Sequence, residues 1–309
     1  MFHQIKVKNK KQGLIDLHTH STASDGSFKP REIVLLAKKI GLRAVALTDH
    51  DTVKGLDEFM QAGTENKLET VPGVELSAHF EKGTLHILGY FLDYKNPTLI
   101  TKLKKFQQVR AERNPKIIKK LQALNIPITY EEVIAISGGG QIGRPHIAKV
   151  LLDKGIVNTF DEAFQRFLKK GGPAYVEKEY ISPKECIEII LEAGGLPVLA
   201  HPFTLHLENR ELEVFVKKLK TWGLEGIEIY YTEHTQEQIN FYLYLAQRFN
   251  LCITGGSDFH GEQKKEIKLG FGYGNLRIPY SLLEKLKEVY YAKYRDRFIR
   301  NQKTRTKSL

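Results

Sequence analysis

The chain has 309 residues, the length of two average domains or of one barrel with an insertion. It is 41% hydrophobic and 27% charged, which supports a large core and excludes a disordered protein. The net charge is +11, but residues 1–12 carry +4 of it and residues 293–309 carry +6. The body is nearly neutral, so the sequence excludes a globally basic nucleic-acid-binding surface and indicates two basic tails.

Membrane and secreted classes are also disfavoured. No apolar stretch approaches the roughly 20 residues of a membrane helix, and the first residues lack the apolar segment of a signal peptide. Cys186 and Cys252 are far apart and each lies in an apolar run, so we expect two core thiols rather than a disulfide or a thiolate zinc site. A cytoplasmic protein without a membrane partner is expected; the sequence does not indicate its oligomeric state.

Short apolar runs alternate with helical patterns along most of the chain. Strands are predicted at residues 14–17, 44–48, 68–76, 85–92, 197–200, 226–231 and 251–254, and helices at 30–40, 53–65, 208–221 and 236–249. Glu81-Lys82-Gly83 is a turn signal, and it predicts a hairpin between the third and fourth strands. Alternating strands and helices predict a parallel α/β sheet, and apolar strands with polar ends suit a TIM-like barrel.

The middle of the chain has a different pattern. Residues 97–168 contain helical patterns at 98–125, 130–136, 144–154 and 161–168, interrupted by Gly138-Gly139-Gly140, and no convincing strand. We therefore expect barrel segments at 13–96 and 173–292, an all-helical insertion domain at 97–172, and a basic C-terminal tail at 293–309. The insertion is interpreted as a lid over the site; the alternative is that it only extends the helical layer of the barrel.

Histidine and carboxylate side chains follow the predicted strands at their carboxyl ends. His18-Thr19-His20 comes directly after the first strand, and residues at i and i+2 of an extended segment point to the same side. The carboxyl ends of barrel strands gather at one face, so these side chains should meet there and bind metal. Four further strands show the same placement, with Thr48-Asp49-His50-Asp51, Glu75, His201 and Ser257-Asp258-Phe259-His260 at their ends.

With these motifs the sequence resembles the polymerase-and-histidinol-phosphatase (PHP) family of metal-dependent phosphoesterases. The resemblance covers about residues 13–280 and implies a distorted (β/α)7 barrel. Gly143-Arg144-Pro145-His146 in the insertion is similar to the subgroup that acts on nucleoside 3′,5′-bisphosphates and the 5′ end of short RNA. The matching motifs are His18-Thr19-His20, Asp25-Gly26, Thr48-Asp49-His50-Asp51, Pro72-Gly73-Val74-Glu75, His86, His201-Pro202 and Gly256-Ser257-Asp258-Phe259-His260.

The resemblance implies two or three divalent metal ions and their ligands. Six imidazoles and three carboxylates suit Mn, Fe or Zn better than Ca or Mg. Two metals sharing a carboxylate would supply a hydroxide that attacks phosphorus, with Glu75, Asp25 and His201 as catalytic ligands. The implied ligand sets are His18, His20, Glu75 and Asp258; Glu75, His86 and His201; and Asp25, His50 and His260.

Other polar residues have two interpretations each. Asp16, Asp49 and Asp51 would orient imidazoles or cap turns. His234 would contact substrate or donate a proton to the leaving oxygen, unless it only precedes a helix. Phosphate-binding candidates are Arg144, His146 and the Lys169-Lys170 turn, which are otherwise solvated charges.

The leading hypothesis is an enzyme that hydrolyses phosphate esters of nucleotides or short RNA. The alternatives are a phosphatase of the histidinol-phosphate type and an amidohydrolase-type C–N hydrolase, which spacing alone does not separate from it. A module that binds RNA through the basic tails is disfavoured as the whole function, because it has no use for nine metal ligands; as an addition, the tails would contact RNA or only solubilise the chain.

Overall fold

The computed structural model describes residues 13–137, 142–176 and 181–295. Its centre is a seven-stranded sheet in which the strands follow one another in chain order. Leu17 N donates to Gly255 O at 3.2 Å and Asp258 N donates to His18 O at 2.9 Å, so the first strand meets the last and the sheet closes. The strands are β1 (Ile15–Asp16), β2 (Ala44–Leu47), β3 (Glu69–Ala78), β4 (Leu85–Tyr90), β5 (Leu196–Leu199), β6 (Gly226–Tyr231) and β7 (Cys252–Gly256).

The predicted α/β barrel is confirmed, but a wholly parallel sheet is wrong. β4 runs antiparallel to both β3 and β5, whereas the other neighbouring pairs are parallel. The reason is the predicted hairpin: a short connection after β3 reverses the chain, and the long insertion after β4 returns it before β5. This single reversed strand distorts the barrel.

Most of the helices cover the outside of the barrel. Alternate residues of one strand face opposite sides, so Val45 and Leu47 pack against the surrounding helices while Ala44 and Ala46 face the barrel interior. The predicted helix at 53–65 begins only at Leu56, after a turn, and two helices of the barrel were not predicted, α7 and α10. The helices are α1 (Pro30–Lys39), α2 (Leu56–Asn66), α7 (Pro183–Glu192), α8 (Asn209–Thr221), α9 (Gln236–Arg248) and α10 (Ser281–Lys293), with the short helices η2 (Pro202–Leu205) and η3 (Gly261–Lys264).

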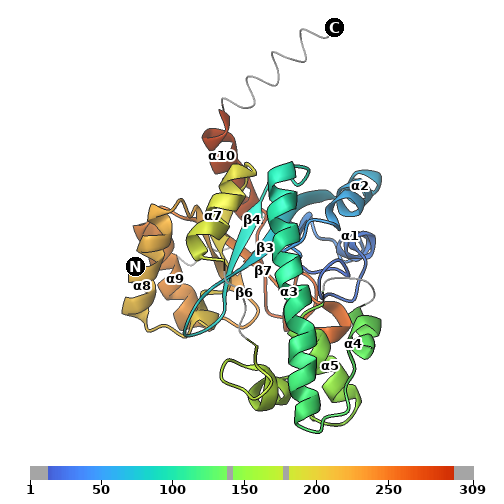
Figure 1. Cartoon of the computed structure of the whole chain (residues 1–309). Coiled ribbons are helices and arrows are strands. Elements are labelled where there is room, and N and C mark those ends of the chain that lie inside the picture. Colours follow the sequence, from blue (N-terminus) through green and yellow to red (C-terminus); the bar gives the residue numbers. More distant parts are fainter. Residues whose placement is uncertain (1–12, 138–141, 177–180, 296–309) are drawn as a thin grey trace.

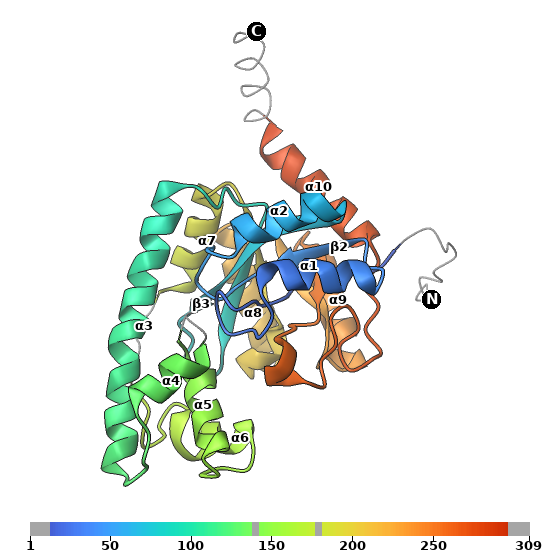
Figure 2. The ribbon, with the colours of Figure 1, turned by 90° about the vertical axis from the view of Figure 1, so that its right-hand side faces the viewer.

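α10 fills one end of the barrel. Its Leu282, Leu283 and Leu286 belong to the same buried cluster as Ile15 and Leu17 of the first strand region. Figures 1 and 2 show α10 at the end of the molecule opposite to the helical insertion. One end of the barrel is thus sealed by apolar side chains, and polar chemistry is confined to the other.

The helical insertion forms a lobe with its own hydrophobic cluster. It contains α3 (Pro97–Ala123), α4 (Tyr130–Ser137), α5 (Arg144–Asp153), α6 (Phe160–Ala163) and η1 (Phe164–Leu168). Figure 2 shows α3 running along the side of the barrel into this lobe. Leu99 and Leu103 of α3 pack in the barrel cluster, whereas Ile117 and Leu121 pack in the lobe cluster. α3 therefore joins the two cores as one continuous helix.

Several predictions fall outside these ranges or need correction. The Gly138–Gly140 loop, the N-terminal basic segment and nearly all of the 293–309 tail lie outside the described residues. Cys186 is buried as predicted, but Cys252 is only half-buried. In the part of the chain that the structure describes, no helix is both long and apolar enough to cross a membrane.

Gly256 provides a direct test of how the barrel closure places the site. A Cβ at this position would lie 2.1 Å from His18 Cβ and 2.5 Å from His18 N, which the backbone cannot relieve without moving β1. We expect Gly256→Ala to lower the free energy of unfolding by about 3 kcal/mol or more. The measurement is the denaturant midpoint.

Gly226→Ala in the neighbouring strand is the matched control. Its Cβ would first meet a side-chain methyl, Val198 Cγ2 at 2.9 Å, which can shift. The two variants should therefore differ clearly in stability; equal, small losses would contradict the account of the β1–β7 closure.

Candidate metal centre

One end of the barrel brings the predicted side chains together. His18 and His20 follow β1, His50 follows β2, and Glu75 lies within β3, where His50 and Glu75 form a parallel bridge. His86 lies near the amino end of the reversed strand β4, His201 follows β5, and Asp258 and His260 follow β7. Asp25, in the loop between β1 and α1, groups with His20, His50 and His260. All nine predicted ligands therefore meet at the end of the barrel opposite α10.

The first implied ligand set is reproduced as one compact group. His18, His20, Glu75 and Asp258 each offer a nitrogen or oxygen, and these atoms lie within 4.8 Å of one another. His20 Nε2 is 3.0 Å from Asp258 Oδ1 and 3.3 Å from Glu75 Oε2. The four residues are buried, so their donor atoms face one another rather than solvent.

The other two implied sets are present with additions. His20 joins Asp25, His50 and His260 in one group, and His50 joins Glu75 and His86 in another. His201 lies next to the group that contains Glu75: its Nε2 is 3.0 Å from Glu75 Oε1.

Glu75 connects the two sides of the cluster. Its Oε2 lies 3.3 Å from His18 Nε2 and 3.0 Å from His50 Nδ1, whereas its Oε1 lies 2.8 Å from His86 Nδ1. The side chain is fully buried. The two oxygens thus face different imidazoles of the cluster, as they do in a bridging carboxylate.

The cluster's own electrostatics favour bound cations. Burial raises the pKa of Glu75 and Asp258, but neighbouring positive groups outweigh it and hold both pKa values well below the usual range. Burial lowers the pKa of His20, but Asp258 and Glu75 outweigh it and raise that pKa to about 10. The carboxylates therefore stabilise positive charge at their centre.

The donor atoms also fit metal ions. Among the described residues, buried His18 Nε2, His20 Nε2, His50 Nδ1 and Glu75 Oε2 make no hydrogen bond, although buried polar atoms normally do. Burial, with His20 and His86 nearby, lowers the pKa of His50 to about 3. Mixed imidazole and carboxylate donors suit Mn, Fe or Zn.

A buried carboxylate that the sequence analysis missed supports the imidazoles. Glu228 of β6 is fully buried; its Oε1 accepts from His18 Nδ1 at 3.0 Å, and its Oε2 accepts from His201 N at 2.9 Å. It fixes the His18 tautomer so that Nε2 faces the cluster. The available signal was a single acid inside an otherwise apolar strand.

Of the two interpretations of Asp16, Asp49 and Asp51, the contacts agree with the capping of turns. Asp16 accepts from the Ser257 backbone and hydroxyl at 2.9 and 2.5 Å, and Asp49 accepts from Ser21 N at 2.7 Å. Asp51 Oδ1 accepts from Ser77 N at 2.9 Å. These carboxylates fix the loops that carry the ligands, because backbone N–H groups face them.

Three of the eight non-glycine residues with positive φ in the described part of the chain lie in the same loops. His201, Asp258 and Asp51 have φ values of 22°, 57° and 50°, in the left-handed region that side chains normally avoid. Such conformations cost about 1–3 kcal/mol each and persist only where the surrounding structure enforces them. Here they turn His201 and Asp258 toward the cluster.

A cavity of about 560 Å³ opens from the cluster toward the insertion. Asp25, His50 and His86 of the barrel line it. Arg144 and Lys170 of the insertion line it as well, as does the β3–β4 hairpin. The structure thus brings the basic side chains that the sequence singled out to the same space as the metal-binding candidates.

The phosphate-binding candidates differ in their surroundings. Arg144 Nη1 donates to Leu168 O at 2.9 Å, and its guanidinium lies 5.6 Å from the Phe164 ring. Lys170 Nζ is 3.5 Å from Glu81 O. His146 is buried, its Nδ1 accepts from Gly143 N at 3.0 Å, and burial lowers its pKa. It caps the start of α5, and its substrate role stays a prediction.

His234 lies outside the metal-binding groups of the described residues. Its Nδ1 donates to Ile229 O at 2.8 Å, and its ring packs against Phe203, Tyr231 and Tyr242. Burial lowers its pKa to about 4, so the imidazole is neutral near pH 7 with its proton on Nδ1. This environment disfavours the predicted proton-donor role.

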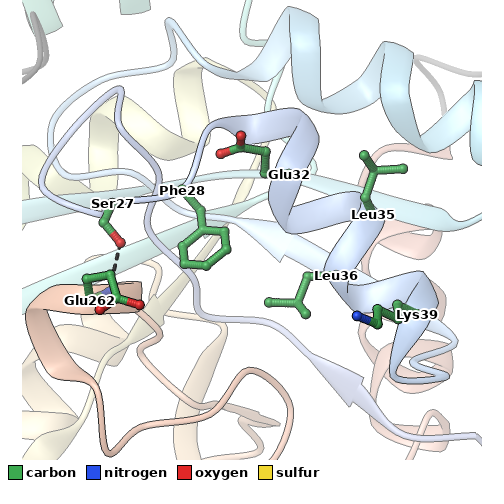
Figure 3. A pocket seen from close by; sticks show the side chains of 7 residues that line it. All are labelled: Ser27, Phe28, Glu32, Leu35, Leu36, Lys39 and Glu262. Carbon is green, nitrogen blue, oxygen red and sulfur yellow. Dashed lines mark hydrogen bonds between the residues drawn. The ribbon is translucent and has the colours of Figure 1, made fainter.

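A second hollow, of about 470 Å³, lies on the outer surface beside α1. Figure 3 shows Phe28, Leu35 and Leu36 lining it, and Ser27 Oγ accepting a hydrogen bond from Glu262 N at 2.8 Å. Its lining contains no histidine and no member of the metal cluster. The chemistry therefore belongs to the cavity at the barrel end.

The fold and this centre define a metal-dependent hydrolase of the TIM-like barrel class. The PHP domain model matches residues 16–179, and the chain belongs to the PHP family of metal-dependent phosphoesterases. A solved structure from Bifidobacterium adolescentis, titled as a metal-dependent phosphoesterase, shares 30% identity and a TM-score of 0.78 over 88% of this chain and 94% of that chain.

Two curated relatives match over most of their length. A 5′-3′ exoribonuclease from Haemophilus influenzae is 35% identical over 79% of this chain and 89% of its own. A 3′,5′-nucleoside bisphosphate phosphatase from Chromobacterium violaceum is 31% identical over 82% of this chain and 90% of its own. Both names agree with the subgroup that the sequence motifs resemble.

Replacing Glu228 tests its support of the cluster. In Glu228→Gln the amide keeps the shape, but the negative charge facing His18 Nδ1–H is lost. We expect Mn²⁺ affinity to fall about 10- to 100-fold, the usual effect of removing such a partner. Equilibrium dialysis with Mn²⁺ measures it; Glu225→Gln, on the neighbouring surface, should bind Mn²⁺ like the wild type.

Proposed function

We propose that this protein hydrolyses phosphate esters of nucleotides, either nucleoside 3′,5′-bisphosphates or the 5′ end of short RNA, with two or three divalent metal ions held by the nine clustered residues. The observation that carries the proposal is the cavity that Asp25, His50 and His86 line together with Arg144 and Lys170. The names of the relatives support the same substrate class.

The metal ligands are assigned by their groups. His18, His20, Glu75 and Asp258 would hold one ion; Glu75, His86 and His201 a second; Asp25, His50 and His260 a third. Bound Mn, Fe or Zn ions would lower the pKa of a water molecule toward neutrality and neutralise phosphate oxygens. Glu75 would contribute to two of these sets, since its two oxygens face different imidazoles.

The protein's own side chains orient the substrate. Asp25 and His201 would each hold one of the ions that bind the reacting phosphate. Arg144, held between Leu168 O and the Phe164 ring, presents a planar guanidinium suited to a second phosphate group. Lys170 adds positive charge to the same cavity. A substrate with two phosphates would therefore bind the metal-holding residues with one phosphate and the basic side chains with the other.

A phosphate-release screen on metal-reconstituted protein tests the function. Nucleoside 3′,5′-bisphosphates and 5′-phosphorylated short RNA should be turned over faster than histidinol phosphate, and a cyclic amide should not react. Faster hydrolysis of the amide than of every phosphate ester would replace this function with C–N hydrolysis.

Glu75→Gln should reduce turnover at least about 100-fold while the barrel stays folded. Glu188→Gln, which replaces an exposed carboxylate on α7, is the control.

Arg144→Ala tests the second phosphate site. Losing the guanidinium removes charge-assisted hydrogen bonds to the second phosphate. KM for the bisphosphate should rise by the equivalent of about 1–3 kcal/mol of binding free energy, and KM for an aryl phosphate should change little. Arg166→Ala is the matched control, because Arg166 lies in the same lobe over Phe167 but outside the cavity lining. Equal losses on both substrates would mean that Arg144 supports the fold instead.

A further inference from the structure

The two carboxylate oxygens of Asp258 have different surroundings. Oδ1 faces the metal cluster, at 3.0 Å from His20 Nε2 and 3.4 Å from His18 Nε2. Oδ2 points the other way, where it accepts from Tyr231 Oη at 2.9 Å and from Lys264 Nζ at 2.7 Å. Neither donor belongs to the metal-binding groups.

The two donors come from different parts of the barrel end. Tyr231 is the last residue of β6 and is buried, with 4% of its surface exposed. Lys264 is the last residue of η3, and its side chain is 41% exposed. The Asp258 backbone is already in the left-handed region, so the carboxylate is fixed both at its backbone and at Oδ2.

We propose that Lys264 is a positioning residue for the metal centre: together with Tyr231 it occupies Oδ2 of Asp258, so that only Oδ1 is presented to the ion. Without these donors the carboxylate is free to rotate and to bind with either oxygen or with both. The ammonium also offsets negative charge in a cluster that contains three carboxylates, Asp25, Glu75 and Asp258. This inference rests on the proposed metal-dependent function.

Direct contact of Lys264 with substrate phosphate is the competing role for a partly exposed lysine. The ion pair with Asp258 favours positioning, because the Nζ is already held at hydrogen-bond distance on the ligand. The two roles differ in what they change. Positioning alters metal affinity without substrate, whereas substrate contact alters KM alone.

The test compares Mn²⁺ binding by the full-length chain in the absence of substrate. Lys264→Met removes the ammonium and keeps an unbranched side chain, Lys264→Arg retains the charge, and Lys265→Met is the control. Lys265 is the adjacent residue; its side chain is 75% exposed and pairs with Glu262 on the surface. We expect Lys264→Met to weaken Mn²⁺ binding about tenfold, and Lys264→Arg to restore most of it.

Kinetics on the bisphosphate complete the test. In Lys264→Met at subsaturating Mn²⁺, turnover should fall while KM stays within about twofold, and added Mn²⁺ should restore it. Wild-type Mn²⁺ affinity in Lys264→Met, or a raised KM with unchanged metal affinity, would overturn the positioning role. A wild-type protein that binds neither Mn²⁺, Zn²⁺ nor Fe²⁺ would overturn the proposed function itself, so the two failures are distinguishable.

Discussion

The constraint on which the structure depends is electrostatic: the three carboxylates of the metal-binding groups, Asp25, Glu75 and Asp258, are buried at one end of a barrel and need positive charge beside them. Burying an ionised group without compensation is strongly unfavourable. Glu75, at the centre, is surrounded by five imidazoles from four chain segments, and Glu228 accepts a hydrogen bond from one of them, His18. Strand order, the closure of β7 on β1 and the strained loops at His201 and Asp258 all serve to bring these groups together.

The barrel and most of the clustered residues could be predicted because both leave a local trace. Apolar runs predict strands, and a histidine directly after such a run predicts which end of the barrel carries the site. Asp25 and His86 have no such local signal and were implied only by the resemblance to the PHP family. The implied first ligand set, from His18 to Asp258, reappears as one group in the structure.

The features that the sequence did not predict depend on contacts between distant segments. Glu228 lies 210 residues from His18, and nothing in its local pattern says which histidine it faces. Asp16 is the last residue of β1, two positions before the ligand His18, yet it binds the Ser257 loop. Lys264 resembles any lysine of a surface turn until Asp258 is placed beside it.

The position of α10 has a consequence for how the protein is made. Leu282, Leu283 and Leu286 complete the apolar interior that begins with Ile15 and Leu17, and β7 supplies the last edge of the sheet. During synthesis the N-terminal histidines therefore emerge long before the residues that enclose them. The barrel therefore closes, and the complete set of candidate ligands assembles, only once almost the whole chain has left the ribosome.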